Sequence, residues 1–361
     1  MWKICNYMVM QLDRIQNRII EPDCTLLEAM KKMDDIKMKV LFVFCHDKFE
    51  GILTIGDIQR AIIKGCSLNN AINDILDRNK IYADVSESID SIKKKMELIR
   101  AECMPVLNKG DLVKVYTWEE LFAESDEPKK KMLDLPVVIM AGGLGTRLKP
   151  LTNVIPKPLV PVGDKTILEV IMDQFEEIGC RKFYMSVNYK ADMMEYYLSK
   201  LPHKYDIEFF MENTPLGTIG SVALLKGKIK TPFFVSNCDS INDQDYRDVY
   251  DYHQNNHNDM TIVTMIKTFK IPYGVIETGE DGLMVALREK PEQTYMVNTG
   301  AYILNPDLID EIPEGKFFHI TDLMEKVKAR GGRVGCFPVS EKAWHDMGDW
   351  DEYLRMINIK L

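Results

Sequence analysis

A glycine-rich run followed by two cations is the clearest chemical signal in this sequence. Residues 142–147 read Gly-Gly-Leu-Gly-Thr-Arg and come directly after the apolar run Pro136–Met140. Because glycine has no side chain, the backbone of such a turn can approach a phosphate group closely. Arg147 and Lys157 follow, ten residues apart, in a segment interrupted by prolines. Arginine offers a forked donor and lysine a point charge, so the two could converge on a polyphosphate.

Two familiar phosphate-binding patterns do not fit this run. A dinucleotide-binding fingerprint needs a glycine where the sequence has Leu148. A Walker loop needs Gly-Lys followed by Ser or Thr, but the nearest candidate reads Gly163-Asp164-Lys165. A longer string is a far more specific pattern. It reads Gly-x-Gly-Thr-Arg-Leu-x-Pro-Leu-Thr from Gly143 and then Pro-Lys-Pro-Leu from Pro156.

The elements expected around this run indicate an α/β domain with a mostly parallel sheet. The predicted strands are 136–140, 183–188, 207–211 and 233–236, and the helices between them are 167–178 and 192–200. Beyond residue 260 the pattern becomes mainly β. In sheets of this kind, ligands bind beyond the carboxyl ends of the strands. The glycine-rich run and Asp239 both fall at such ends.

Composition and charge limit the class of protein. The chain has 361 residues, of which 46% are hydrophobic and 28% charged, so we expect a globular protein with two domains. A net charge of −9 argues against broad nucleic-acid binding, and no apolar run is long enough to span a membrane. The amino terminus has no signal-peptide core and the eight cysteines are scattered, which favours reduced thiols in the cytoplasm.

The first 125 residues contain an internal repeat at an offset of 63 residues, with Thr54 aligned to Thr117. Residues 52–58 read Ile-Leu-Thr-Ile-Gly-Asp-Ile and align with Val-Tyr-Thr-Trp-Glu-Glu-Leu at 115–121. Each copy predicts a capped helix, two short strands and a second helix, and the two copies would bury their apolar faces against each other. The charged stretch 126–134 predicts a linker, so the expected domains are 1–125 and 135–361.

Two family resemblances rest on these motifs. Residues 135–361 resemble the sugar-1-phosphate nucleotidyltransferase family. The matching segments are the string from Gly143, Pro215–Thr218, Asn237–Asp239, Glu289-Lys290 and residues 344–348. The repeat resembles a tandem CBS pair, or Bateman module. The implied fold is a mixed, mostly parallel Rossmann-like (GT-A-like) domain preceded by an α+β CBS pair. Because the CBS pair comes before the transferase domain, the chain resembles the guanylyltransferases of legionaminic-acid pathways. Those enzymes make GDP-glucosamine from GTP and glucosamine-1-phosphate.

The resemblance implies attack by a sugar-1-phosphate oxygen on the α-phosphorus of a nucleoside triphosphate, with pyrophosphate leaving. A phosphomonoester has its second pKa near about 6, so its oxygen is already ionised and no general base is required. Catalysis then depends on aligning two anions and neutralising their repulsion. By resemblance, Arg147 and Lys157 hold the triphosphate. Asp239 and Asp346 hold the implied cofactor, Mg²⁺, which prefers hard carboxylate oxygens.

Further residues receive roles through the same resemblance. Those expected to bind the nucleotide are Ala141, Gly142, Gly143, Gly145, Thr146, Glu212, Gly217 and Thr218. Those expected to bind the sugar phosphate are Gly274, Glu289, Lys290 and Asn298. The alternative for each is a purely structural role, such as a turn, a helix cap or a surface ion pair.

The identity of the base is predicted from Glu212. Guanine presents adjacent N1–H and N2–H donors, and one carboxylate can accept both. Uracil and thymine offer a single N–H between two carbonyls, which suits an amide better. Glu212 therefore favours GTP, while UTP stays open. Mannose-, heptose- and N-acetylglucosamine-1-phosphate are alternative sugars, and a non-catalytic nucleotide sensor is an alternative of another class.

The repeat has its own candidate ligand residues. In CBS pairs the Thr and Asp positions can hold the ribose of an adenine nucleotide, because a carboxylate accepts hydrogen bonds from a cis-diol. The matching residues are Thr54 and Asp57 in the first copy and Thr117 and Glu120 in the second. The second copy departs from the pattern, since Lys114 stands where the first has glycine. The alternative is a scaffold for self-association, and a homo-oligomer is expected.

Overall fold

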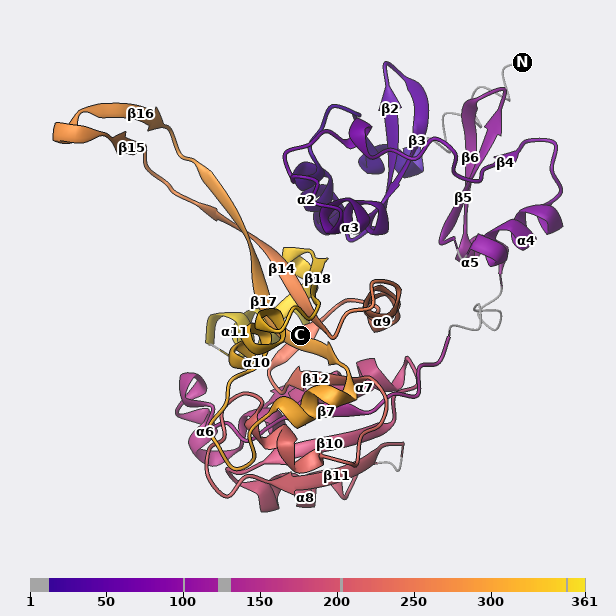
Figure 1. Ribbon diagram of the computed structural model, residues 1–361. Helices are drawn as coiled ribbons and strands as arrows, with labels where there is room; N and C mark the ends of the chain where they lie inside the picture. Colours follow the sequence, from indigo (N-terminus) through magenta and orange to yellow (C-terminus); the bar gives the residue numbers. More distant parts are fainter. Residues whose placement is uncertain (1–12, 100, 123–130, 202–203, 349, 361) are drawn as a thin grey trace. The chain divides into compact units, whose positions relative to one another are not determined.

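The computed structural model describes residues 13–99, 101–122, 131–201, 204–348 and 350–360 (Figure 1). The chain divides into two compact units, Met1–Lys130 and Lys131–Leu361. Part of the predicted linker, residues 126–130, lies outside the described residues, as do the first twelve residues of the predicted CBS module.

The first unit contains two copies of one small arrangement, each built on a three-stranded sheet. In each copy the first strand runs parallel to the second, and the second and third form an antiparallel hairpin. The first copy comprises β1 (Ile19–Ile20), α2 (Leu26–Ile36), β2 (Val40–Cys45), β3 (Lys48–Thr54) and α3 (Ile55–Ile63). The second comprises β4 (Ala83–Asp84), α4 (Ile89–Ile99), β5 (Cys103–Asn108), β6 (Asp111–Thr117) and α5 (Trp118–Leu121). The predicted order of helix, two strands and helix is therefore present twice.

The two copies share a hydrophobic core. Phe42, Phe49 and Ile52 of the first copy form one buried cluster with Cys103 and Leu112 of the second. These residues lie on the hairpins, whose inner faces carry the larger apolar side chains. Neither hairpin could bury this face alone, so each copy depends on the other for its core.

The predicted CBS ligand positions form helix caps. The Thr54 hydroxyl accepts a hydrogen bond from the Asp57 N–H, while the Asp57 carboxylate accepts one from the Thr54 N–H. Thr117 and Glu120 make the same reciprocal pair at the start of α5. Such pairs satisfy backbone donors that a helix N-terminus leaves open. The Asp57 carboxylate also binds the Lys80 ammonium.

The second unit is built on a seven-stranded mixed sheet. In order across the sheet its strands are β11 (Asp206–Met211), β10 (Lys182–Val187), β7 (Val137–Met140), β12 (Phe233–Asn237), β17 (Glu292–Leu304), β14 (Met260–Lys270) and β18 (Val334–Val339). The first four are mutually parallel, and β17 runs antiparallel to both of its neighbours. The predicted class, a mixed and mostly parallel α/β sheet behind a CBS unit, is confirmed.

The second unit also contains helices and short strand pairs outside this sheet. The helices are α6 (Leu151–Val154), α7 (Ile167–Glu176), α8 (Ala191–Leu198), α9 (Tyr246–Asn255), α10 (Ile320–Ala329) and α11 (Trp350–Lys360). The strand pairs are β8 (Pro161–Val162) with β9 (Lys165–Thr166), β13 (Ser240–Asn242) with β19 (Trp344–Asp346), and β15 (Val275–Thr278) with β16 (Met284–Arg288). None of the helices that the structure describes is long and apolar enough to cross a bilayer.

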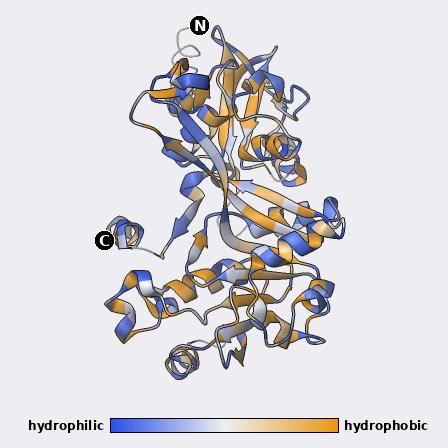
Figure 2. Cartoon of the chain, turned by 60° about the vertical axis from the view of Figure 1, so that its left-hand side comes forward, coloured by the Kyte–Doolittle hydropathy of each residue, from blue (hydrophilic) through white to orange (hydrophobic). Residues whose placement is uncertain are grey.

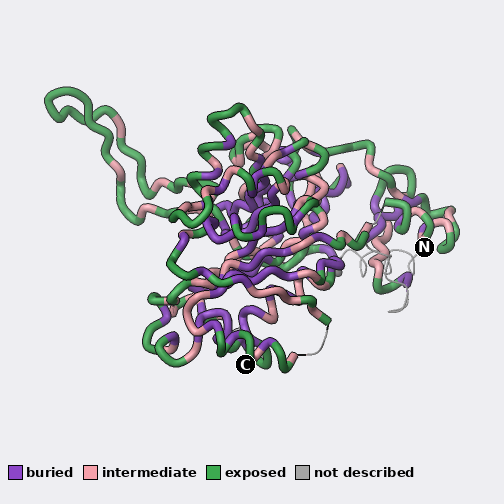
Figure 3. The backbone as a smooth tube through the Cα atoms, turned by 60° about the horizontal axis from the view of Figure 1, so that its bottom comes forward, coloured by how far each residue is buried: buried purple, intermediate pink, exposed green. Residues whose placement is uncertain are grey.

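The core of the second unit lies on both faces of the central strands. Val137, Val138 and Ile139 of β7 are fully buried, as expected for a parallel strand covered on both sides. Hydrophobic residues concentrate in the strands and in the helix faces that cover them (Figure 2), and the buried part of the chain follows the same elements (Figure 3). This rigid sheet holds the ends of β7 and β12 in fixed register.

One part of the second unit leaves this core. β14 and β17 continue past the sheet and end in the β15–β16 hairpin, which projects from the rest of the unit (Figures 1 and 3). Most residues from Phe269 to Lys290 are exposed. We call residues 271–291 the arm.

Replacing Asp57 with Asn should destabilise the first unit, because the mostly buried Lys80 ammonium loses its anionic partner. We expect a loss of about 1–3 kcal/mol in the free energy of opening α3. Burial by itself raises the pKa of Asp57, but hydrogen bonds from Lys80 and Thr54 outweigh it and hold that pKa below its usual value. The contribution of Asp57 is therefore complete above about pH 4 and is lost as the pH falls through the folded-state pKa.

Native-state hydrogen exchange of the α3 amides, at pH 7 and in acid, measures both effects. The exposed carboxylate of Asp111 supplies a control, since Asp111→Asn should change the opening free energy by less than about 0.5 kcal/mol. Equal protection of α3 in wild type and Asp57→Asn would contradict the interpretation.

Candidate active site

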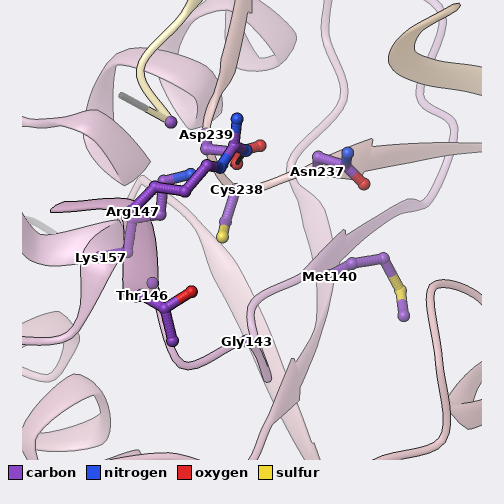
Figure 4. Close-up of a pocket in the computed structure, with 10 residues that line it drawn as sticks. Met140, Gly143, Thr146, Arg147, Lys157, Asn237, Cys238 and Asp239 are labelled. Carbon is purple, nitrogen blue, oxygen red and sulfur yellow. Dashed lines mark hydrogen bonds and ion pairs between the residues drawn. The ribbon is translucent and has the colours of Figure 1, made fainter. Parts of the chain in front are cut away.

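A pocket lies where two neighbouring parallel strands end. β7 ends at Met140 and β12 at Asn237, and these two residues are paired in the ladder. The cavity has a volume of about 230 Å³. Figure 4 shows the residues that line it. It is lined by Met140, Gly143, Gly145, Thr146, Arg147, Lys157, Asn237, Cys238, Asp239 and Gly348. The structure therefore brings the glycine-rich turn, both predicted phosphate-binding cations and Asp239 into one pocket.

The glycine-rich turn is held by close packing at Gly145. This residue has φ +62°, a left-handed conformation that favours glycine. A Cβ atom there would lie 2.9 Å from Thr152 Cγ2 and 3.0 Å from Lys157 Cβ, so no side chain fits. The buried Thr152 hydroxyl donates a hydrogen bond to the Gly145 carbonyl at 2.8 Å. Thr152 thus ties the turn to the segment that carries Lys157. The sequence patterns assigned no role to Thr152.

Two cations and two carboxylates meet at the mouth of the turn. Lys157 is buried and its ammonium is bonded to the Asp239 carboxylate. The Arg147 guanidinium lies 3.4 Å from Asp346 Oδ2 and 4.0 Å from Asp239 Oδ2, with its side chain 60% exposed. Without a ligand, the four charges compensate one another. An entering polyphosphate would meet one preset, buried cation and one cation that is free to reorient.

Asp346 reaches this cluster through strand pairing. β13 and β19 are antiparallel, with Ser240 opposite Asp346, and the Met347 N–H donates to the Asp239 carbonyl at 2.8 Å. The Gly348 N–H donates to Asp346 Oδ1, also at 2.8 Å. A Cβ atom on Gly348 would lie 2.5 Å from an Arg147 nitrogen, so a side chain there would displace the guanidinium from its present position.

The donor set at Asp239 and Asp346 suits a hard divalent cation. Among the residues described, no group of three or more His, Cys, Asp or Glu side chains could hold a metal ion. The two carboxylates are nevertheless held close enough to share the Arg147 guanidinium. Mg²⁺ is usually bound by one or two carboxylates and completed by phosphate oxygens and water. The two residues therefore fit Mg²⁺ that is held jointly by protein and nucleotide.

Glu212 follows directly after β11 and is almost completely buried. The Ser186 hydroxyl lies 2.5 Å from Glu212 Oε1, and the Leu216 N–H donates to Oε2 at 3.2 Å. Ser186 Oγ is also 2.9 Å from Ser221 Oγ, and both serines are fully buried. A hydroxyl has only one proton, so Ser221 donates to Ser186 when Ser186 donates to Glu212. This chain of neutral donors fixes the orientation of the carboxylate.

The other predicted base-binding residues fall into two groups. Ala141 donates its N–H to the Ser186 carbonyl at 3.0 Å, and a Cβ atom on Gly142 would lie 3.0 Å from Glu212 Oε1, so these residues and Glu212 lie together. Gly217 instead packs against the Phe318 backbone. The Thr218 hydroxyl accepts a hydrogen bond from the first N–H of α10 at 2.9 Å. Gly217 and Thr218 therefore help to hold α10. Like Ala141, Gly142 and Glu212, they are not among the residues that line the pocket.

The predicted sugar-phosphate residues are only partly brought to the pocket. Asn298 lies on β17, where its side-chain oxygen accepts a hydrogen bond from the N–H of Gly300, and Gly300 packs against the pocket residue Asn237. Glu289 lies beside Gly274 in the arm. Asn298 and Glu292 are six residue steps apart along β17, which at about 3.3 Å per residue is roughly 20 Å. The structure thus keeps Gly274, Glu289 and Lys290 out of the pocket lining.

Comparison with known proteins identifies the family. The model of the nucleotidyl transferase family matches residues 136–360. This chain belongs to the nucleotidyl transferase family. The CBS domain model matches residues 15–64, which is the first copy of the repeat. The nucleotidyltransferase resemblance is thereby confirmed at the level of the family, and the CBS resemblance is confirmed for the first copy of the repeat. The resemblance to the guanylyltransferases of legionaminic-acid pathways stays a prediction.

Several mannose-1-phosphate guanylyltransferases are similar to the nucleotidyl transferase unit. The catalytic subunit beta from Drosophila pseudoobscura pseudoobscura is 37% identical over 182 residues, which is 48% of this chain and 49% of that protein. The mannose-1-phosphate guanyltransferase of Schizosaccharomyces pombe is 32% identical over 229 residues, 61% of this chain and 62% of the other. This chain thus spans from about half to about three fifths of the length of these curated relatives.

Solved structures of similar fold include HddC from Yersinia pseudotuberculosis. It is 28% identical, with a TM-score of 0.50, and the match covers 63% of this chain and 100% of HddC. A second structure of HddC, with the same identity and TM-score, is a complex with GMP-PN.

Several residues of the nucleotidyl transferase unit, some lining the pocket and some behind Glu212, were not assigned roles from the sequence. Asn237 and Cys238 line the pocket beside Asp239, and the motif that contains them was the available signal. Burial raises the pKa of the Cys238 thiol to about 12, so it stays protonated at neutral pH, in keeping with a packed residue. Ser186 and Ser221 gave no signal, because a small polar residue in a buried strand or turn has no distinctive spacing.

Replacing Ser186 with Ala should destabilise the nucleotidyl transferase unit, because the buried Glu212 carboxylate loses one of its two donors. We expect a loss of about 1–3 kcal/mol in the free energy of opening β10, measured by native-state hydrogen exchange. Ser199 is an exposed control whose hydroxyl donates to the Tyr196 carbonyl. Ser199→Ala should cost less than about 0.5 kcal/mol. If the two variants were equally stable, the buried chain would have no structural role.

Proposed function

We propose that this protein is a Mg²⁺-dependent guanylyltransferase that transfers GMP from GTP to a sugar-1-phosphate and releases pyrophosphate. The observation that carries the proposal is the pocket at the ends of β7 and β12, where Arg147, Lys157, Asp239 and Asp346 meet. Family membership supports the class of reaction, and the names of the similar curated proteins support GTP as the donor.

The residues of this pocket suit transfer between two anions. The buried Lys157 ammonium has a fixed direction, so it can neutralise the triphosphate without first being ordered. The exposed Arg147 can turn from the carboxylates to a phosphate and bind two of its oxygens. The attacking oxygen of a sugar-1-phosphate is already ionised, so the chain has to align it rather than deprotonate it. Mg²⁺, held by Asp239 and Asp346, would add positive charge at the phosphate oxygens.

Glu212 is proposed to select guanine. Its oxygens accept hydrogen bonds from Ser186 and Leu216, and each carboxylate oxygen has a second lone pair that a ligand can use. The backbone at Gly142 lies alongside, which leaves space for a flat base rather than a side chain. Guanine carries two adjacent donors on its pairing edge and so matches an ionised carboxylate. Uracil, with one donor, would leave one of these acceptor positions unused.

For the sugar, the sequence favours glucosamine-1-phosphate, and the names of the similar enzymes favour mannose-1-phosphate as the second candidate. We assign Asn298, Glu289, Lys290 and the backbone at Gly274 to the sugar phosphate. For the CBS unit, the internal bonds of Thr54 and Asp57 support a scaffold more than an adenine-nucleotide sensor.

Pyrophosphate release measures the proposed reaction directly. Four nucleoside triphosphates are crossed with glucosamine-, mannose-, heptose- and N-acetylglucosamine-1-phosphate in the presence of Mg²⁺. We expect turnover with GTP and at least about a hundredfold loss in Lys157→Met, because the transition-state charge loses its buried cation. Turnover with UTP alone would exclude the proposed base. Nucleotide binding by folded protein without turnover for any pair would favour the sensor alternative.

Replacing Glu212 with Gln tests the recognition of guanine. An amide has one acceptor oxygen and presents an NH2 group to the second guanine donor, so the advantage of GTP over ITP, which lacks the 2-amino group, should fall about tenfold or more in kcat/KM. Glu208→Gln is a matched control, since Glu208 lies on β11 and pairs with Lys228 away from the pocket. It should leave the GTP-to-ITP ratio unchanged. The same ratio in Glu212→Gln as in wild type would exclude Glu212 as the base-reading residue.

A further inference from the structure

The short helix α6, between the two cations of the pocket, ends in backbone carbonyls that its own sequence leaves without donors. In an α-helix, each carbonyl accepts a hydrogen bond from the N–H four residues further on. The residue four positions after Thr152 is Pro156, and the residue four positions after Val154 is Pro158. Proline has no N–H, so neither carbonyl can be satisfied by a continuing helix. The end of α6 therefore needs donors from another part of the fold.

These donors come from the loop between β10 and α8. The Tyr189 hydroxyl donates to the Thr152 carbonyl at 3.3 Å. The Lys190 ammonium donates to the carbonyls of Asn153 and Val154, at 2.7 and 2.6 Å. A lysine ammonium has three N–H donors and suits the free carbonyls at a helix C-terminus. Three successive carbonyls thus accept from two successive side chains, which together cap the end of α6.

The same part of the chain also holds Glu212. The Asn188 side-chain amide donates to the Glu212 carbonyl at 2.5 Å, and the Ser186 hydroxyl bonds the Glu212 carboxylate. Residues 186–190 therefore connect the two ends of the proposed nucleotide site. The connection continues to the glycine-rich turn, because the Thr152 hydroxyl donates to the Gly145 carbonyl.

We propose that Tyr189 and Lys190 are positioning residues, which fix the segment that carries Lys157 relative to Glu212. Neither side chain is among those that line the pocket, so both act through α6. Only two residues separate the end of α6 from Lys157, so a displacement of that end would displace the cation. Base and triphosphate belong to one molecule, so a site that binds both needs a set spacing between its two ends. This consequence for the reaction rests on the proposed function, whereas the hold on Lys157 does not.

Acetylation of lysine amines by acetic anhydride, followed by mass spectrometry, tests the hold on Lys157 without substrate. The Lys157 side chain is 8% exposed and bonded to Asp239, so its amine should react slowly in the wild-type chain. Lys190→Met keeps an unbranched apolar stem but removes the donors to α6. We expect it to accelerate labelling of Lys157 at least about fivefold, relative to exposed lysines of the same molecule. Tyr189→Phe removes the third donor and should accelerate it about threefold.

Two further variants serve as controls. Lys190→Arg restores donors to the same carbonyls, so labelling of Lys157 should return to within about twofold of wild type. Lys200→Met removes an exposed ammonium that lies 5.2 Å from the centre of the Tyr196 ring, and should also stay within about twofold. Residue 190 has φ +54°, a left-handed conformation whose cost is similar for Lys, Met and Arg. Differences among these variants therefore report the donors and not the backbone.

Kinetics test the consequence for the proposed reaction. We expect Lys190→Met to lower kcat/KM for GTP at least about tenfold, because the phosphate-binding cation loses its alignment. Lys190→Arg should recover most of the activity. The advantage of GTP over ITP should stay within about twofold of wild type, since Glu212 keeps its own donors. A general loosening of the site would reduce that advantage as well.

Other outcomes overturn the proposal. Equal labelling of Lys157 in wild type and Lys190→Met would show that the segment is fixed without these donors. Faster labelling with unchanged kcat/KM would mean that the cap has no part in positioning Lys157 for the reaction. Absence of turnover in the wild-type chain would count against the proposed function instead, and the labelling would still decide whether Lys190 holds Lys157 in place.

Discussion

The bond between the Lys157 ammonium and the Asp239 carboxylate is the constraint on which the candidate site depends. Both side chains are largely removed from water, and an unpaired charge in such a place would be strongly destabilising. The pair joins the end of β12 to the segment after α6, and the glycine-rich turn packs against that second segment. Close packing at Gly145 and the Thr152 hydrogen bond hold these segments together. The same pairing leaves a cation fixed in place for a phosphate.

The two ends of the proposed nucleotide site use charge in opposite ways. At the phosphate end, Arg147 and Lys157 are paired with carboxylates. A polyphosphate therefore has to replace a carboxylate as the partner of a cation. At the base end, the Glu212 carboxylate is held by neutral donors, the Ser186 hydroxyl and the Leu216 N–H. A carboxylate without a cationic partner remains a strong acceptor for ligand N–H groups. In the proposed site, such an arrangement would orient a nucleotide by polarity before a sugar phosphate binds.

The nucleotidyl transferase unit combines a rigid part and an exposed part. The pocket is built on β7 and β12, whose buried side chains belong to the central core. The residues assigned to the sugar phosphate extend from Asn298, beside the pocket, to Glu289 and Lys290 in the arm. Segments with few buried contacts open at lower free energy than core strands, so these parts differ in local stability. Nucleotide binding is therefore expected to depend on the sheet, and sugar binding on the state of the arm.

The sequence by itself determined the fold class, the internal repeat, the family and the grouping of Arg147 and Lys157 near Asp239. These follow from local patterns: strand and helix periodicity, glycine spacing, and the rule that ligands bind where parallel strands end. Only the tertiary structure decided that Ser186 and Ser221 support Glu212, and that Thr218 caps α10. It also decided that Lys290 lies in an exposed arm. Such contacts join residues far apart in the chain, and no local pattern encodes which buried hydroxyl meets which carboxylate or where a long hairpin leaves its sheet.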